Sequence, residues 1–290
     1  MQEVKRALVV EGGGMRCIFT VGVLDAFLQE RFNPFNLFIG VSAGAVSLAS
    51  YLSGQYQRYY RLSTGPMREK EFVSLSRFFL AGGHFMDLDW LWNYAAIHEP
   101  LDAETAVCQG NRDFWVGVTD VRTGNPLFIR PDANSLHNIL LASSALPVMY
   151  RGFVELDGGL FSDGGVAEPL PVKEAYRRGA RSIVVIRTRI ANQSNGWLMD
   201  SLLSMLFLRR HPALSLQIRR HHRIYQDAVQ FIHNPPNDAR VFEIMPPFQL
   251  HSTRIRTDQE TLNADYELGR QAGAQYVMKS RAAQMESVAQ

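Results

Sequence analysis

Ser42 is the residue best suited to nucleophilic chemistry, because it lies in the run 40–44 (GVSAG), which matches the pattern G-x-S-x-G. An apolar stretch at 37–39 precedes this run and small and apolar residues follow it, so the pattern stands between an expected strand and an expected helix. Gly40 and Gly44 would allow a sharp turn that projects the Ser42 hydroxyl at the start of that helix, where an oxyanion is stabilised. The pattern therefore predicts a nucleophilic Ser42; a serine that only caps the helix is the alternative.

Three consecutive glycines, Gly12, Gly13 and Gly14, follow the first apolar run of the chain. Their N–H groups are not obstructed by Cβ atoms, so they are suited to hold a developing oxyanion, together with the N–H of Ala43 after the nucleophile. A phosphate would fit the same loop. However, the dinucleotide pattern G-x-G-x-x-G requires a third glycine where Cys17 stands, and no P-loop lysine follows.

Two Asp-Gly-Gly turns offer a carboxylate that could act as the base for this serine. Asp163 is followed by Gly164 and Gly165, and then by two prolines that hold the loop before the next helix rigid. Asp157 stands between two short apolar runs, where an Asp-Gly pair is typical of a hairpin turn. We therefore expect Asp163 to be the base and Asp157 to be a turn residue.

Arg16 lies in the first turn of the helix expected after the glycine loop. A cation there opposes the helix dipole, at a cost of up to about 1 kcal/mol. We therefore expect a compensating partner or a function for Arg16, with a surface salt bridge as the alternative.

Alternating strand and helix patterns run through the chain. Strands are expected at 7–10, 37–39, 114–119, 126–129, 182–186 and 241–244, and later helices at 135–143, 172–178, 197–210, 214–231 and 259–279. This alternation predicts an α/β fold, a three-layer α/β/α domain with a mainly parallel central sheet. The least regular stretches, 54–100 and 191–237, are interpreted as insertions around a site. We expect one domain over 1–290, with a motif-bearing core at about 7–187 and an extension at about 188–290.

The composition is that of an ordinary globular protein, with 46% hydrophobic and 20% charged residues. A formal net charge of +2 does not favour nucleic acid as a partner. Two cysteines, Cys17 and Cys108, cannot form a disulfide framework, and no metal-ligand spacing or calcium loop is present, so no metal and no cofactor are expected. The N-terminal residues lack a signal-peptide core, which predicts a cytoplasmic protein.

An apolar run at 197–208 is followed by Arg209 and Arg210, and later by the basic run 219–223. The apolar run is too short to cross a bilayer, which takes about 20 residues. One interpretation is a buried helix beside a basic, solvated face. The other is a peripheral contact of residues 197–223 with the inner face of an anionic membrane.

Four motifs in a fixed order carry a resemblance to a known family: the runs 12–16 (GGGMR), 40–44 (GVSAG), 142–147 (ASSALP) and 163–165 (DGG). Together they resemble the bacterial branch of the patatin-like phospholipases, from about residue 7 to residue 186. The resemblance implies a lipid acyl hydrolase with a Ser–Asp dyad.

In that family pattern Ser42 attacks an ester, Asp163 is the base and the glycine loop forms the oxyanion hole. The substrates that the resemblance implies are lipid carboxyl esters, phospholipids among them. Cys17 departs from the pattern, because the family has a glycine after the arginine, and the local packing there must accommodate the change.

Other functions stay open on the sequence alone. A Ser-Asp-His triad could use His233 or His251, which follow Ser42 and Asp163 in the order typical of α/β-hydrolases. A lipid-binding protein with the same fold and no turnover is an alternative from a different class. Acyl transfer to an acceptor lipid would use the same residues as hydrolysis. The oligomeric state is not predicted.

Overall fold

The computed structural model describes residues 5–80, 83–108, 110, 112–190, 208–255 and 257–288. Most of the helix expected at 197–210, and of the apolar run within it, lies outside these residues. The strands and helices below all belong to the described part of the chain.

A central sheet of eight strands has the order β5-β6-β3-β2-β1-β7-β8, with β4 paired to β3. Strands β3, β2, β1, β7 and β8 are parallel, and β4, β5 and β6 each pair antiparallel with their neighbours. The bounds are β1 Lys5–Val10, β2 Leu37–Val41, β3 Asp113–Asp120, β4 Pro126–Ile129, β5 Val154–Leu156, β6 Gly159–Asp163, β7 Ala180–Ile186 and β8 Arg240–Ile244. The mainly parallel sheet is confirmed.

Strand β1 is apolar on both faces, which is why it reads as one continuous hydrophobic run. Leu8 and Val10 pack into the larger of two cores, and Ala7 and Val9 pack into the core on the opposite face. Successive side chains of a strand point to opposite faces, so these residues bind helices on both sides of the sheet.

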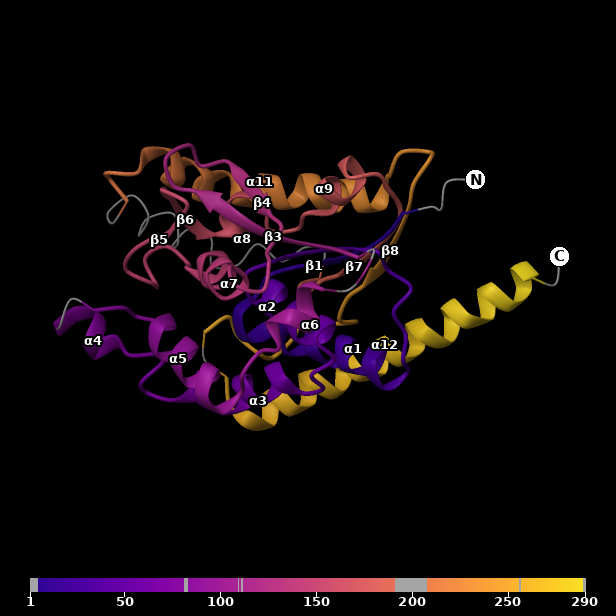
Figure 1. Cartoon of the computed structure of the whole chain (residues 1–290), viewed down its shortest axis with the longest axis horizontal. Coiled ribbons are helices and arrows are strands. Elements are labelled where there is room, and N and C mark those ends of the chain that lie inside the picture. The colour runs from indigo at the N-terminus through magenta and orange to yellow at the C-terminus, as the bar shows by residue number, and fades with distance from the viewer. Residues whose placement is uncertain are drawn as a thin grey trace.

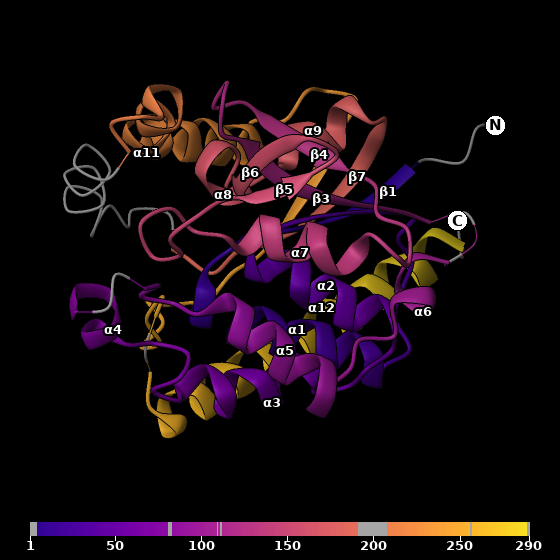
Figure 2. The ribbon, with the colours of Figure 1, turned by 60° about the vertical axis from the view of Figure 1, so that its left-hand side comes forward.

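Helices cover both faces of the sheet and complete the three layers (Figure 1). On one side lie α1 (Cys17–Gln29), α2 (Ala43–Leu52), α3 (Arg58–Thr64) and α12 (Gln259–Val288), and on the other lie α9 (Val172–Arg177) and α11 (Pro212–His233). Figure 2 shows α7 (Leu136–Ser144) in front of α2, and α8 (Gly164–Ala167) beside β6. The α/β/α architecture is therefore confirmed.

Helix α12 packs tightly along α1, although nearly the whole chain separates the two in sequence (Figure 1). A Cβ on Gly269 would lie 2.0 Å from the carbonyl oxygen of Phe19, and a Cβ on Gly22 would lie 2.2 Å from that of Tyr266. Only glycine allows this approach. The C-terminal segment is thereby fixed against the motif-bearing part of the chain.

The segment 54–100 was expected to be irregular, and that expectation is wrong. Besides α3, it contains a 3-10 turn at Pro66–Arg68, α4 (Leu75–Leu80) and α5 (Leu88–His98), and α6 (Ala103–Val107) follows. Asp87 caps α5 by accepting a hydrogen bond from the N–H of Trp90 at 3.0 Å. The aromatic residues of α5 have modest helix propensity, so its stability depends on tertiary packing that no local pattern shows.

The strand order reverses beside β1, which has β2 on one side and β7 on the other. Parallel strands end at the same edge of a sheet, so the loops after β1, β2 and β7 meet there. Open α/β sheets bind their ligands at such a reversal point. The glycine loop and Ser42 both lie at this edge, following β1 and β2.

Candidate active site

Ser42 occupies a strained turn between β2 and α2. Its backbone has φ 53° and ψ −138°, a conformation that non-glycine residues rarely adopt. The flanking glycines make the turn possible: a Cβ on Gly44 would lie 2.5 Å from the carbonyl oxygen of Glu11, and one on Gly40 would lie 2.8 Å from Cα of Ala45. Such a strained strand-to-helix turn is typical of an exposed nucleophile.

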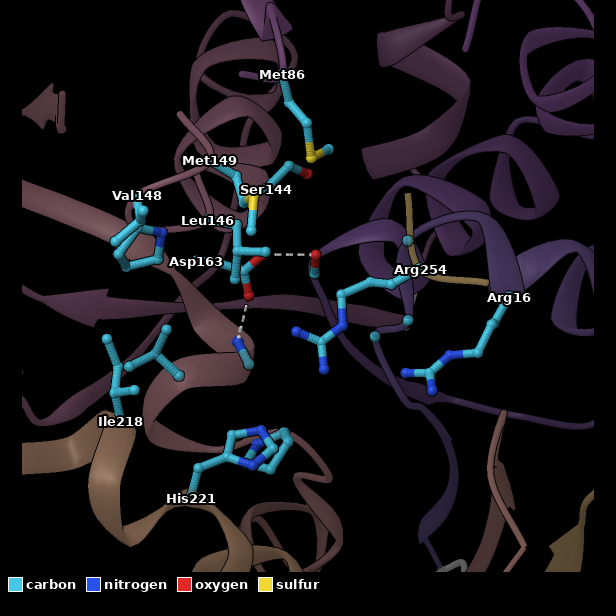
Figure 3. Close-up of a pocket in the computed structure, with 18 of the residues that line it drawn as sticks. Arg16, Met86, Ser144, Leu146, Val148, Met149, Asp163, Ile218, His221 and Arg254 are labelled. Carbon is cyan, nitrogen blue, oxygen red and sulfur yellow. Dashed lines mark hydrogen bonds between the residues drawn. The ribbon is translucent and has the colours of Figure 1, made fainter. Parts of the chain in front are cut away.

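The Ser42 hydroxyl donates a hydrogen bond to Oδ2 of Asp163 at 2.6 Å (Figure 3). The other oxygen of that carboxylate, Oδ1, accepts from the N–H of Gly165 at 2.7 Å, which orients it. Gly164 lies between Asp163 and Gly165 in the chain, and a Cβ on it would be 2.0 Å from the carbonyl oxygen of Gly117 on β3. The structure thus brings together two residues that are 121 positions apart in the sequence.

Asp163 is almost completely buried, with 4% of its surface exposed. Burial raises the pKa of its carboxyl group to about 6, although the hydrogen bonds from Ser42 and Gly165 act in the opposite direction. A carboxylate with this pKa is ionised at neutral pH and is a stronger base than a carboxylate in water. These properties suit the removal of a proton from a hydroxyl group.

A second serine supports the strained turn. The N–H of Ser42 donates to Oγ of Ser143 at 2.8 Å, and the Ser143 hydroxyl donates to the carbonyl oxygen of Gly117 at 2.6 Å. Thr119 supports the backbone of Asp163, because its hydroxyl donates to the carbonyl oxygen of that residue at 2.8 Å. No sequence signal assigned these roles to Ser143 and Thr119, although run 142–147 contains the first of them.

The glycine loop lies directly against the serine. A Cβ on Gly12 would be 3.0 Å from Cβ of Ser42, and Gly14 has a positive φ of 58°. Within the described chain, the N–H groups of Gly12, Gly13, Gly14 and Ala43 make no backbone hydrogen bond outside regular helices and strands. The loop and the first residue of α2 therefore offer donors beside the Ser42 hydroxyl.

Cys17 is accommodated without disturbing this loop. Its side chain is fully buried, and its thiol lies 3.7 Å from the carbonyl oxygen of Glu11, to which it donates. Burial raises the pKa of the thiol, so Cys17 is not a thiolate at neutral pH. The residue acts here as a small packing group.

Arg16 does not form the surface salt bridge considered for it. Its Nε and Nη2 atoms are buried and make no hydrogen bond to any described residue. Burial, and then the nearby charge of Arg189, lower the pKa of Arg16 to about 10, so it stays protonated at neutral pH. Together with Arg189, Arg254 and His221, it lines a cavity that Ser42 and Asp163 also line. Sequence reasoning assigned none of the last three to this site: Arg189 and Arg254 stand outside any motif, and His221 belongs to the basic run 219–223, which was interpreted as a solvated face or a membrane contact.

Two cavities open onto Ser42. The first has a volume of about 120 Å³ and contains the dyad, the glycine loop and the arginines, opposite an apolar wall that includes Leu146, Val148 and Ile218 (Figure 3). The second is larger, about 300 Å³, and its walls are mainly apolar residues of α2, α3 and α5. Ser144 lines both cavities, and its buried hydroxyl oxygen makes no hydrogen bond to any described residue.

The other residues considered at the sequence level lie elsewhere. His233 pairs with Glu243 at 3.7 Å and His251 is exposed, and neither lines either cavity at Ser42. Asp157, with φ 48°, forms the hairpin turn between β5 and β6, as predicted.

Two further kinds of feature are absent from the described part of the chain. None of its helices combines the length and the apolar character that a membrane crossing requires. No group of three or more His, Cys, Asp or Glu side chains among the same residues is arranged to hold a metal ion.

The chain is similar to proteins of one known family. A model of the patatin-like phospholipases matches residues 8–176, and a model described only as a domain of unknown function matches residues 211–282. The uncharacterized protein YjjU of Escherichia coli is 37% identical over 282 residues, which cover 93% of this chain and 76% of that protein. Lysophospholipase NTE1 of Saccharomyces cerevisiae is 24% identical over 85% of this chain, but only 15% of its own length is matched.

Among solved structures, human GIVD cytosolic phospholipase A2 covers 93% of this chain and 57% of its own, with a TM-score of 0.49 and 13% identity. That likeness is too distant to carry an inference about the site. The family model, by contrast, spans more than half of the chain and includes Ser42 and Asp163. This chain therefore belongs to the patatin-like phospholipase family.

Proposed function

We propose that this protein hydrolyses carboxyl esters of lipids through Ser42 and Asp163. The observation that carries the proposal is the 2.6 Å hydrogen bond from the Ser42 hydroxyl to a buried carboxylate, at the junction of two cavities. The family of the chain and its lysophospholipase relatives support lipid esters as the substrate class. Phospholipids and lysophospholipids are included in that class.

The reaction begins when Oγ of Ser42 attacks the ester carbonyl carbon and its proton passes to Oδ2 of Asp163. The carbonyl oxygen becomes an oxyanion, and the N–H groups of Gly13, Gly14 and Ala43 are the proposed donors to it. As the tetrahedral intermediate collapses, the ester C–O bond breaks and Asp163 returns its proton to the departing alcohol. An acyl group then remains on Ser42.

Water completes the cycle by the reverse sequence. Asp163 takes a proton from a water molecule while the water oxygen attacks the acyl carbon. Asp163 then returns that proton to Oγ of Ser42 when the fatty acid leaves. The same carboxylate acts as base and acid in both halves. A pKa near 6 suits this role, because Asp163 is ionised before each attack and can still release the proton afterwards.

The larger cavity is the proposed site of the acyl chain. It reaches from Ser42 and Val46 to Leu62 and Leu91, and is lined by side chains that favour a hydrocarbon over water. A chain bound there leaves the alcohol part of the ester in the smaller cavity with the arginines.

A dyad is favoured over a Ser-Asp-His triad because the Ser42 hydroxyl bonds directly to the carboxylate, with no imidazole between them. A binding protein without turnover would not need a strained serine held by Ser143.

We also propose that residues 188–290 belong to the same domain as the core, because α12 packs on α1 and Arg254 lines the dyad cavity.

Labelling with a fluorophosphonate probe tests the proposal. The purified protein should react covalently at Ser42, and Ser42→Ala should abolish both the labelling and the hydrolysis of 4-nitrophenyl butyrate. Ser144→Ala is the matched control, since Ser144 is a neighbouring serine on both cavities whose hydroxyl makes no hydrogen bond to Asp163. Equal labelling of the wild type and Ser42→Ala would overturn the enzyme proposal.

A further inference from the structure

Arg16, Arg189 and Arg254 reach the dyad cavity from three separate parts of the chain. Arg16 ends the 3-10 turn Gly14–Arg16 just before α1, Arg189 follows β7, and Arg254 lies between β8 and α12. Figure 3 shows the guanidinium groups of Arg16 and Arg254 beside each other, on the side of the cavity opposite Leu146 and Val148. Three cations share a space of about 120 Å³ with the dyad.

Backbone contacts fix these arginines in the site. The N–H of Met15 donates to the carbonyl oxygen of Arg254 at 3.1 Å, which ties the loop after β8 to the glycine loop. The N–H of Thr188 donates to Oε2 of the fully buried Glu11 at 2.7 Å, and Nε of Arg189 lies 3.2 Å from Oε1 of the same carboxylate. The cluster is therefore part of the built site and not a set of solvated surface side chains.

Among the described residues that line this cavity, three arginines accompany a single carboxylate. Glu11 compensates Arg189, and Asp163 is the only carboxylate among the described residues that line the cavity. Burial, and then the charges of Arg189 and Arg254, hold the pKa of His221 well below its usual range, so its imidazole is neutral. Nε and Nη2 of Arg16 are buried donors with no hydrogen-bond partner in the described chain. A buried cation without such a partner is costly unless an anion completes the site.

We propose that Arg16, Arg189 and Arg254 form a subsite for the phosphate monoester of a lipid head group, so that the preferred substrate is an acylglycerol phosphate. This proposal rests on the function proposed above and refines its substrate class. Arginine binds phosphate through paired N–H groups, and several arginines neutralise its double charge. The site also lies where the strand order reverses at β1 and β7, as anion sites in open α/β sheets do.

The same cavity is poorly suited to a cationic head group. A choline or ammonium group needs carboxylates or an aromatic cage. The described lining residues contain no Phe, Tyr or Trp, and their only carboxylate is the base Asp163. Arg189 and Arg254 both follow residue 176, where the family match ends. The part of the chain after the family match therefore provides two of the three arginines of the proposed subsite.

The decisive experiment compares three esters that share one acyl chain: 1-decanoylglycerol, its 3-phosphate and its 3-phosphocholine derivative, each dispersed below its micelle concentration. The wild type should have the highest kcat/KM for the phosphate, by at least about tenfold over the other two esters. Loss of one charge-assisted contact costs roughly tenfold to 100-fold. Arg254→Gln should lower the ratio of phosphate to neutral ester by that factor, and Arg254→Lys should lower it less.

Arg219→Gln is the matched control, since Arg219 is an exposed arginine of α11 that does not line the cavity. It removes the same charge from the molecule and should leave the ratio unchanged. An equal drop in this control would assign the preference to overall charge and overturn the proposal. Thermal unfolding of each variant identifies any that do not fold.

A binding measurement gives an answer that does not require turnover. The Ser42→Ala protein should bind 1-decanoylglycerol 3-phosphate more tightly than 1-decanoylglycerol in calorimetry, and inorganic phosphate should compete only weakly. If inorganic phosphate binds as tightly as the lipid phosphate, the site is one for free phosphate and the head-group proposal is wrong. Hydrolysis of all three esters at equal rates would also overturn it, whereas a protein that hydrolyses no ester contradicts the function itself.

Discussion

Asp163 must be buried beside Ser42 and yet be ionised to act as a base. Its pKa of about 6 reflects that conflict, because burial favours the neutral carboxyl group. Only the ionised form can take the proton of Ser42. We therefore expect kcat/KM for 4-nitrophenyl butyrate to rise about tenfold per pH unit below pH 6 and to level off above it. A profile that stays flat from pH 5 to pH 8 would exclude Asp163 as the base.

Replacement of this carboxylate should abolish turnover. Asp163→Asn keeps the shape of the side chain but cannot accept the proton, so no hydrolysis should be measurable above background. Asp157→Asn is the matched control, since it changes an exposed aspartate in the β5–β6 turn, where asparagine tolerates the positive φ. If Asp157→Asn were inactive and Asp163→Asn active, the carboxylate would be wrongly assigned.

Asp163→Asn should also be more stable than the wild type at neutral and alkaline pH. A carboxyl group whose pKa is raised on folding contributes stability in its protonated form, and this contribution is lost as the pH rises from 3.8 through about 6. Above pH 6 the wild type therefore bears the cost of a buried charge, at most about 3 kcal/mol. Asp163→Asn should unfold at a higher urea concentration than the wild type at pH 8, and this difference should shrink at pH 5. A less stable variant at pH 8 would show that the hydrogen bonds of Asp163 outweigh the cost of its burial.

At the scale of elements, apolar side chains of α5 form part of the wall of the larger cavity, which Ser42 also lines. Ala95 lies on that wall. Ala95→Leu should fill part of the cavity and lower kcat/KM for dodecanoyl esters relative to butanoyl esters by roughly tenfold, since one added methylene can have that effect in a tight pocket.

Ile97→Phe provides the control for this change. Ile97 lies on the same helix but is 75% exposed and does not line the cavity, so a larger side chain there should leave the chain-length preference as it is. An unchanged preference in Ala95→Leu, measured over esters of 4 to 12 carbons at about equal concentration, would show that the acyl chain binds elsewhere.

At the scale of the whole molecule, α12 connects the C-terminal part to the core through its contact with α1. Gly269→Ala tests this contact with opposing expectations. Helix propensity alone predicts a gain of about 1 kcal/mol, whereas the added Cβ would lie 2.0 Å from the carbonyl oxygen of Phe19. We expect a net loss of about 1–3 kcal/mol in urea unfolding, as is usual for overpacking. A more stable variant would contradict the close packing.

A surface contact with membranes remains a proposal for residues 197–223, of which 208–223 are described. Arg209 and Arg210 are exposed, and each arginine near an anionic bilayer contributes about 1 kcal/mol. Arg209→Glu with Arg210→Glu should weaken binding to phosphatidylserine vesicles tenfold or more, and the Lys double variant should bind like the wild type. Wild-type binding that is insensitive to salt would contradict an electrostatic contact.

Local sequence determined much of the fold and part of the candidate site. Buried parallel strands are continuous apolar runs, so β1 and β2 could be predicted from their residues, as could the hairpin turn at Asp157. Ser42 and Asp163 could be singled out because their proposed roles require particular neighbours within a few residues: glycines for a sharp turn, and a rigid loop for a carboxylate. These requirements are local, and local sequence records them.

Tertiary structure decided what depends on residues far apart in the chain. Helix α5 was missed because packing stabilises it against modest propensity. Arg189 and Arg254 stand in no motif, and they meet Arg16 only because parallel strands bring the loops after β1, β7 and β8 to one edge of the sheet. The pKa of Asp163 likewise follows from its burial by distant segments. The sequence thus determined which side chains are candidates for the reaction. The fold decided how basic Asp163 is and which charges surround it, because burial and electrostatic interactions depend on neighbours in space.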